Sequence, residues 1–205
     1  MKKNRRRTIR WIVLLVMAFS MLAGSRTVHA STKKKAIRAY KQFLADKSAD
    51  TYFSVIYLDK NTVPELLYNE APAFYKYSDM YTFKKGKMRL LSNEVSQAYW
   101  YVKKTGVIIG SNYYSDGMNY NVNKDYHKMS GLKVTFRTRF TKHAERDFSA
   151  GNYSKNKRNY YYNAKWKSIS KSKNKKIVKN LKGSKKELVI KWYKNTEANR
   201  SKYIK

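Results

Sequence analysis

The sequence predicts an α+β domain with a central antiparallel β-meander, an N-terminal amphipathic helix and one or two C-terminal helices. Two observations lead to this prediction. Apolar residues recur at helical spacing near both ends of the chain, and the middle contains aromatic segments joined by turns rich in lysine and glycine. Residues 31–205 are numerous enough for a single domain with a sizeable core.

Residues 1–30 have the three parts of a cleavable signal peptide. The first ten residues are strongly basic, and residues 11–24 are almost wholly apolar. Val28 and Ala30 are small residues at the two positions that a signal peptidase reads, so cleavage is expected before Ser31. The alternative is an uncleaved membrane anchor, but a spanning helix needs about 20 apolar residues and this run is shorter. The sequence therefore predicts a secreted protein with no membrane span after cleavage.

The expected secreted chain is strongly basic and contains no cysteine. Residues 31–205 hold 39 Lys and Arg residues against 13 Asp and Glu residues, a formal net charge of +26. Such a charge creates a field that attracts polyanions, so an anionic cell-wall polymer or another polyanion is the expected partner. The lysine-rich stretch near the C-terminus supplies the candidate polyanion-binding residues, which are Lys171, Lys173, Lys175 and Lys176.

The first elements of this chain follow from periodicity. Apolar residues at three- and four-residue spacing predict a helix over 33–47, with Ser31 or Thr32 as its cap. Residues 52–58 are β-branched and aromatic and predict a buried strand, and a further element begins at 64–68 after a tight turn.

Three hairpins are predicted next, over 81–88, 100–109 and 126–134, and each contains a glycine where the turn needs a positive φ. Asp116-Gly117 marks another turn. Residues 141–158 are polar and weakly periodic, which indicates a long loop.

The C-terminal third predicts a strand at 160–162 and a helix from the cap Ser170 to Lys182, stopped by Gly183. Ile177, Val178 and Leu181 are the expected buried stripe of this helix. A strand over 188–193 and a short helix over 196–204 complete the predicted fold.

Several segments, at 39–44, 57–67, 81–87 and 193–203, resemble a group of secreted proteins, most of unknown function, from clostridial and related Gram-positive bacteria. In that group a strand ends in a calcium-loop-like pattern, DxNxDGxPELL. The resemblance implies an extracellular location and an α+β fold, and it implies no reaction.

The segment at 57–67 is a degenerate version of that calcium loop. It keeps Asp59, Asn61 and Glu65 as oxygen donors, but Tyr57 stands where the first aspartate belongs and Thr62 replaces the glycine. We therefore expect a turn that keeps the strand geometry and no cofactor, with calcium binding as the alternative.

Catalytic motifs are absent from the sequence, since it has no metalloprotease helix, nucleophile elbow, phosphate loop or cysteine. His127 is expected as an ordinary strand histidine. His143 with Glu145 and Asp147 could be drawn as a metal cluster, but the spacing fits no common zinc site.

The leading hypothesis is thus a non-catalytic, secreted or envelope-associated basic protein retained by anionic wall polymers. The alternatives are a secreted hydrolase that cleaves glycans with paired carboxylates, and an extracellular nucleic-acid-binding protein.

Overall fold

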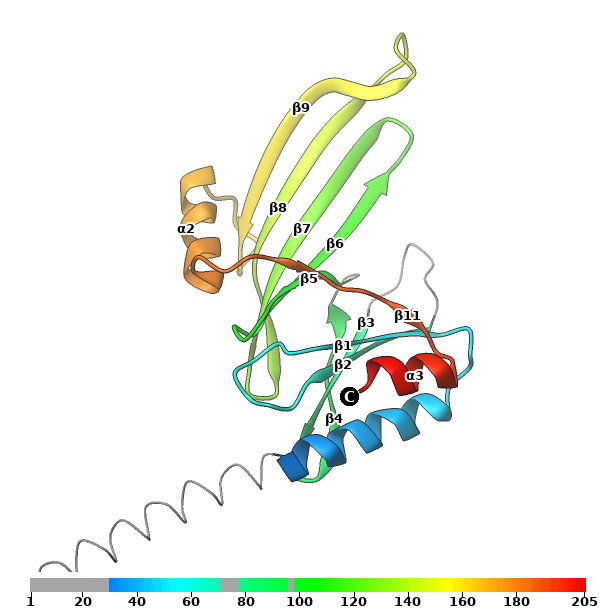
Figure 1. Cartoon of the computed structure of the whole chain (residues 1–205). Coiled ribbons are helices and arrows are strands. Elements are labelled where there is room, and N and C mark those ends of the chain that lie inside the picture. The colour runs from blue at the N-terminus through cyan, green and yellow to red at the C-terminus, as the bar shows by residue number, and fades with distance from the viewer. Residues whose placement is uncertain (1–29, 71–77, 96–97) are drawn as a thin grey trace, which may run out of the picture.

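A computed structural model describes residues 30–70, 78–95 and 98–205 of the chain and shows an α+β fold (Figure 1). The strands form two antiparallel sheets where the sequence predicted one central sheet. Most of the predicted signal peptide, including Val28, lies outside the described residues. Ala30 and Ser31 lie exposed in the first turn of the N-terminal helix, which covers residues 30–45.

The first sheet, sheet A, comprises β1 (Tyr52–Ile56), β2 (Glu65–Asn69), β3 (Ser78–Lys84), β4 (Lys87–Val95) and β11 (Tyr193–Lys194). Sheet B comprises β5 (Ala98–Val102), β6 (Val107–Ser115), β7 (Asn119–Ser130), β8 (Lys133–Asp147), β9 (Asn152–Asn163) and β10 (Leu188–Val189). The strand orders are β11-β1-β2-β3-β4 and β10-β5-β6-β7-β8-β9, so each sheet is a meander with one late strand added at an edge.

The predicted hairpin turns are confirmed. Gly86, Gly106, Gly117 and Gly131 all have positive φ angles, between 64° and 86°. Glycine meets no Cβ penalty in this region, and for this reason the glycine positions alone located four strand ends.

The N-terminal helix and the short helix α3 (Glu197–Tyr203) cover one face of sheet A. Tyr40 and Leu44 of the N-terminal helix are fully buried with Phe53 and Ile204. Thr196 caps α3 by accepting a hydrogen bond from Asn199 N–H. Ser31 and Thr32 lie inside the N-terminal helix, so their predicted role as its cap is wrong.

The other face of sheet A packs against the lower half of sheet B. This core contains Leu67 and Met80 from sheet A and Ala98 and Ile108 from sheet B, all fully buried. The two sheets therefore share one hydrophobic core, and neither sheet buries both faces without the other.

The predicted loop over 141–158 is wrong, because these residues form the end of β8, a turn and most of β9. The upper halves of β6 to β9 project beyond the shared core (Figure 1). Both faces of the projecting strands contact solvent over much of their length, and so the sequence lacks the apolar alternation by which a half-buried strand is recognised.

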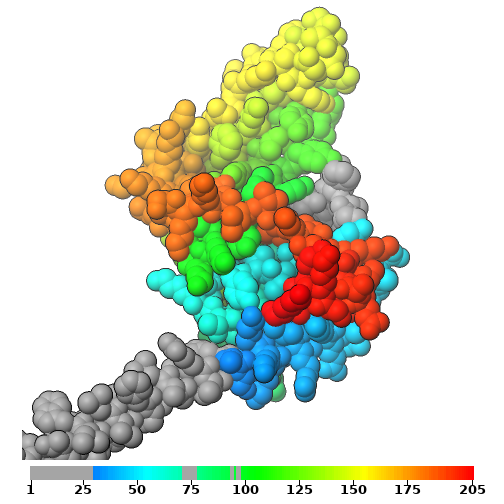
Figure 2. Space-filling view, in the orientation of Figure 1, coloured from blue at the N-terminus to red at the C-terminus, as the bar shows by residue number. Residues whose placement is uncertain are grey.

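The predicted strand over 188–193 is also divided. β10 pairs with β5 in sheet B, and β11 pairs with β1 in sheet A. The buried side chain of Ile190, between the two pairings, belongs to the shared core. Figure 2 shows this C-terminal segment, orange to red, crossing the surface from the upper sheet to the lower body. Among the described helices, none has the length and apolar character needed to cross a membrane.

Candidate functional site

The helix α2 (Lys171–Lys182) lies against sheet B. As predicted, Ser170 caps it by accepting a hydrogen bond from Lys173 N–H, and it ends at Gly183 with a φ of 61°. Val178 and Leu181 pack on a cluster from sheet B, which partly confirms the predicted stripe. The one buried residue in α2 is Asn174, whose amide donates to Thr138 Oγ1 at 2.7 Å.

A groove with a volume of about 610 Å³ lies between α2 and strands β7 to β9. Its sheet side is aromatic and is formed by Tyr126, Phe140 and Tyr161. Phe140 and Tyr161 are direct partners in adjacent antiparallel strands, so they share one face of the sheet, and their ring centroids lie 5.5 Å apart. The register of sheet B therefore builds the aromatic floor, and we call this feature the α2 groove.

The helix side of the α2 groove is basic. Four lysines of α2 line the groove, and these are Lys171, Lys175, Lys179 and Lys182. Lys124 of β7 adds a fifth lysine from the sheet side. Of the residues proposed from sequence, Lys171 and Lys175 line the groove, whereas Lys173 and Lys176 are exposed and do not.

Sequence reasoning missed Lys179, Lys182 and Lys124. Lys171, Lys175 and Lys179 recur every four residues, which places them on one face of a helix, so this periodicity could have identified Lys179. Lys124 comes from β7, fifty residues earlier, and only strand pairing brings it to the groove.

Glu187 neutralises one end of the α2 groove. Its carboxylate binds Lys124 Nζ at 2.6 Å and Lys182 Nζ at 3.0 Å. Burial alone would raise the pKa of Glu187, but the hydrogen bonds from both lysines outweigh burial and hold the pKa below its usual value. No ion pair to an acidic residue occurs at Lys171, Lys175 or Lys179 within the described part of the chain. Three ammonium groups along the groove therefore remain available to an external anion.

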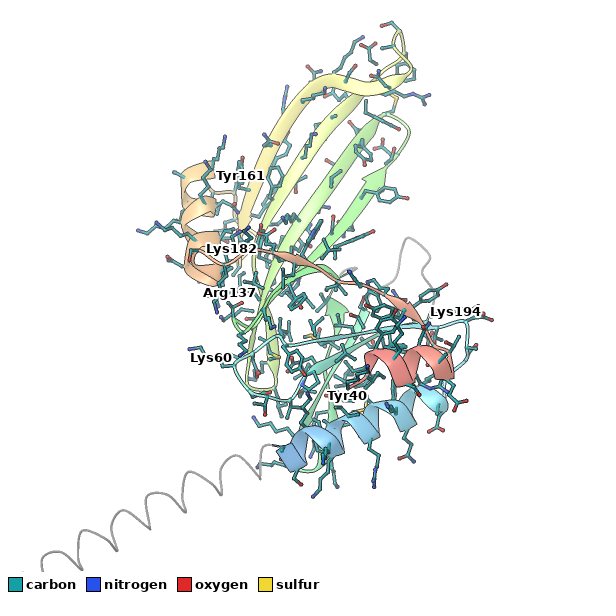
Figure 3. All side chains as sticks on the ribbon, in the orientation of Figure 1. Tyr40, Lys60, Arg137, Tyr161, Lys182 and Lys194 are labelled. Atoms are coloured by element: carbon teal, nitrogen blue, oxygen red, sulfur yellow. The ribbon has the colours of Figure 1, made fainter. Side chains whose placement is uncertain are left out.

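A second cavity, of about 570 Å³, lies where the two sheets meet, and we call it the joint cavity. The residues that line it come from the β1–β2 connection, the β5–β6 turn, β7 and the end of α2. Its lysines are Lys60, Lys104, Lys128, Lys182 and Lys185. Lys182 and Gly183 line both cavities, so the α2 groove and the joint cavity adjoin. Figure 3 shows Tyr161, Lys182, Arg137 and Lys60 in succession along one side of the molecule.

The residues of the calcium-type loop are occupied by contacts within the chain. Both carboxylate oxygens of Asp59 accept hydrogen bonds from Asn61, and Asn61 Oδ1 accepts one from Val63 N–H. Glu65 Oε2 accepts a hydrogen bond from Leu58 N–H at 2.9 Å. These contacts form the turn that the sequence predicted, and the expectation of no bound calcium stays a prediction.

Glu65 differs from an ordinary calcium ligand because its side chain is fully buried. Burial, followed by the nearby charge of Asp59, raises its pKa from 4.5 to about 8, although the hydrogen bond from Leu58 N–H lowers it. Among the described residues its second oxygen, Oε1, has no hydrogen-bond partner. The environment of Glu65 therefore favours the neutral carboxylic acid over the carboxylate.

The other polar candidates lie in strands of sheet B. His143 Nδ1 lies 2.9 Å from Asn121 Oδ1, and Asp147 binds Lys155 at 3.2 Å. The predicted loop placement of His143, Glu145 and Asp147 is thus wrong, because all three belong to β8. No cluster of three His, Asp or Glu side chains suited to a metal ion occurs in residues 30–70, 78–95 and 98–205. His127 is half-buried against Phe136, and burial lowers its pKa.

Carboxylates in sheet B mainly form internal contacts. Asp125, which is buried, binds Arg139 through both of its oxygens, and Glu145 accepts a hydrogen bond from Asn156. Of the described residues that line the α2 groove or the joint cavity, Asp59 alone is acidic. The chemistry of both cavities is therefore that of cations and, in the α2 groove, aromatic rings.

Comparison with known proteins identifies no relative, since no family model, curated protein or solved structure matches the chain.

Proposed function

We propose that this protein is a secreted, non-catalytic polyanion-binding protein that is held at the cell envelope by an anionic wall polymer, and that the α2 groove is the main binding surface. The observation that carries the proposal is the combination of a lysine-lined helix face with an aromatic sheet face in one groove. Lysine ammonium groups bind phosphate and carboxylate as point charges.

The aromatic floor distinguishes this groove from an evenly charged surface. Phe140 and Tyr161, which are partly exposed, line the groove beside the lysines, and Tyr126 is buried at its base. A wall polymer alternates anionic groups with sugar or polyol units, whose C–H faces pack against such rings while the anionic groups meet the lysines. Nucleic acid also offers phosphate and flat rings, and because export does not separate the two, extracellular nucleic acid is the alternative partner.

A salt titration of binding tests the proposal. The chain from Ser31 onward is mixed with a purified anionic wall polymer, and its dissociation constant is measured from 50 mM to 500 mM salt for the parent and for Lys171→Gln/Lys175→Gln/Lys179→Gln. Each lost phosphate contact reduces the slope of log K against log salt by about 0.7 to 1. We expect the triple substitution to reduce this slope by roughly 2.

The matched control removes the same charge outside the groove, in Lys173→Gln/Lys176→Gln/Lys186→Gln. These lysines are exposed and line neither cavity. The control should change the slope by less than half as much as the groove variant. Equal effects of the two variants would show that net charge alone retains the protein. Tighter binding to DNA than to wall polymer at every salt concentration would favour the nucleic-acid alternative.

A further inference from the structure

We infer that the joint cavity is a discrete phosphate-binding site that links the two sheets and receives a phosphate group of the polymer bound in the adjoining α2 groove. Both an inorganic phosphate ion and the phosphodiester group of a polymer would bind here through contacts between lysine ammonium groups and phosphate oxygens. The identity of the polymer rests on the proposed function, whereas binding of phosphate itself does not.

The backbone around the joint cavity is fixed by one hydrogen bond to the segment after β1 and one within sheet B. Gly106 N–H donates to Leu58 O at 2.6 Å, and Met129 N–H donates to Gly106 O at 2.7 Å. A Cβ added to Gly106 would lie 2.6 Å from the carbonyl oxygen of Met129. The β5–β6 turn is thus held close against β7 and against the segment that follows β1. The backbone positions of the lysines on these segments are therefore fixed relative to one another.

The cations of the joint cavity exceed its anions. Five lysines line it against one acid, Asp59, whose oxygens both accept hydrogen bonds from Asn61. Lys182 is paired with Glu187, which leaves four lysines without an acidic partner among the described residues. Lys128 Nζ donates to the backbone oxygen of Thr105. Burial, and then repulsion from Arg137 and Lys60, lowers the pKa of Lys128, so these cations are close enough to repel one another.

Inorganic phosphate, which can carry two negative charges, would offset this repulsion better than chloride would, whereas a phosphodiester carries one charge and differs from chloride in its oxygen acceptors. Phosphate has several oxygens, and these can accept hydrogen bonds from lysines that approach from different segments. The cavity of about 570 Å³ is larger than one phosphate group needs, and it adjoins the α2 groove at Lys182 and Gly183. A chain of phosphodiester and polyol units can therefore enter the joint cavity from the groove.

Phosphate titration of the chain from Ser31 onward tests the inference. The melting temperature and the calorimetric dissociation constant are measured with millimolar potassium phosphate against potassium chloride at equal ionic strength. The test variant is Lys60→Gln/Lys104→Asn/Lys185→Gln. All three side chains are exposed, and asparagine suits the positive φ of 59° at Lys104, so the variant is expected to fold.

We expect phosphate to raise the melting temperature of the parent in a saturable manner, and the test variant to bind phosphate at least about tenfold more weakly. The control Lys173→Gln/Lys176→Gln/Lys186→Gln should respond as the parent does. An equal response of the test variant and the control, or no saturable response in the parent, would overturn the inference.

A competition arm identifies the source of the phosphate. If a wall polymer with phosphodiester units displaces inorganic phosphate from the parent, the site receives the polymer. If phosphate binds and the polymer does not displace it, the site takes the free ion, and the inference stands while its link to the proposed function fails.

Discussion

At the scale of single residues, Glu65 combines a position expected for a metal ligand with the environment of a core residue. It lies in β2, where all five residues are buried, and it accepts a hydrogen bond from Leu58 N–H. Tyr40 lies close to it, and burial, followed by the charge of Glu65, raises the pKa of Tyr40. Burial favours the neutral form of this carboxyl group, because ionisation would leave a buried charge with no cationic partner among the described residues.

The raised pKa of Glu65 predicts that stability falls as the pH rises. Between pH 4.5 and about 8, the folded chain keeps a proton that the unfolded chain has released. The contribution of Glu65 to the free energy of unfolding is therefore fully present below pH 4.5, declines across this window and is lost above about pH 8. Glu65→Gln keeps an acceptor for Leu58 N–H and cannot ionise, so above pH 8 it should be more stable than the parent by on the order of 5 kcal/mol.

Urea unfolding at several pH values measures this difference, with Glu197→Gln, an exposed carboxyl in α3, as the control. The control should follow the parent at every pH. If Glu65→Gln and the parent lose stability in parallel between pH 5 and 9, Glu65 is already ionised at neutral pH in the folded chain.

Among the elements, the β5–β6 turn of sheet B makes backbone hydrogen bonds to the segment that follows β1 of sheet A. Lys104 N–H and Gly106 N–H donate to Tyr57 O and Leu58 O, at 3.1 Å and 2.6 Å. The turn therefore satisfies backbone acceptors at the end of β1 that the ladder of sheet A does not reach. Its geometry depends on a glycine for two reasons, the positive φ of 78° and the close approach of Met129 O.

Gly106→Ala separates these two reasons when it is compared with Gly131→Ala. Gly131 also has a positive φ, of 64°, but an added Cβ there meets nothing within 4 Å. Gly131→Ala, which serves as the control, should lose about 1 to 2 kcal/mol of unfolding free energy from backbone strain. Gly106→Ala should lose a further 1 to 3 kcal/mol, roughly, from steric overlap. Urea unfolding measures both values, and equal losses would mean that the turn moves aside at no cost.

At the scale of the whole molecule, the positive charge is spread over both sheets and all the described helices, while the α2 groove and the joint cavity lie on one side. A distributed charge attracts polyanions over a distance of about one Debye length, roughly 8 to 10 Å at physiological salt. The α2 groove and the joint cavity would make this attraction depend on the shape of the bound polymer as well as on its charge. The proposed function therefore requires the protein to reach an extracellular polymer, which depends on export.

If the predicted signal peptide is cleaved during export, the secreted form should begin at or within a few residues of Ser31. The chain is expressed in a Gram-positive host, and its N-terminus in the culture medium is determined by mass spectrometry. Ala30→Asp places a charged residue at the predicted cleavage site, and it should leave the precursor uncleaved. Recovery of the parent only as a membrane-bound chain starting at Met1 would contradict the prediction and support the membrane-anchor alternative.

Features that depend on near neighbours in the chain could be predicted from the sequence alone. Gly106 and Gly131 marked turns because a positive φ is a local property, and Ser170 and Gly183 marked the ends of α2 because capping groups lie within four residues of the bonds they satisfy. The overall class, α+β, followed from these turns and from the periodicity between them.

Contacts between distant segments determine the division into two sheets and the strands found in place of the predicted loop. They also determine which residues line the two cavities. Lys124 reaches the α2 groove through strand pairing, and Glu65 faces the core because β2 is covered on both sides. Neither position is encoded by neighbouring residues. Burial and charge convergence are sums over segments far apart in the sequence, so helical periodicity groups Lys171 with Lys175 and Lys179 but could not show that this face, and not the face of Lys173 and Lys176, lies against the sheet.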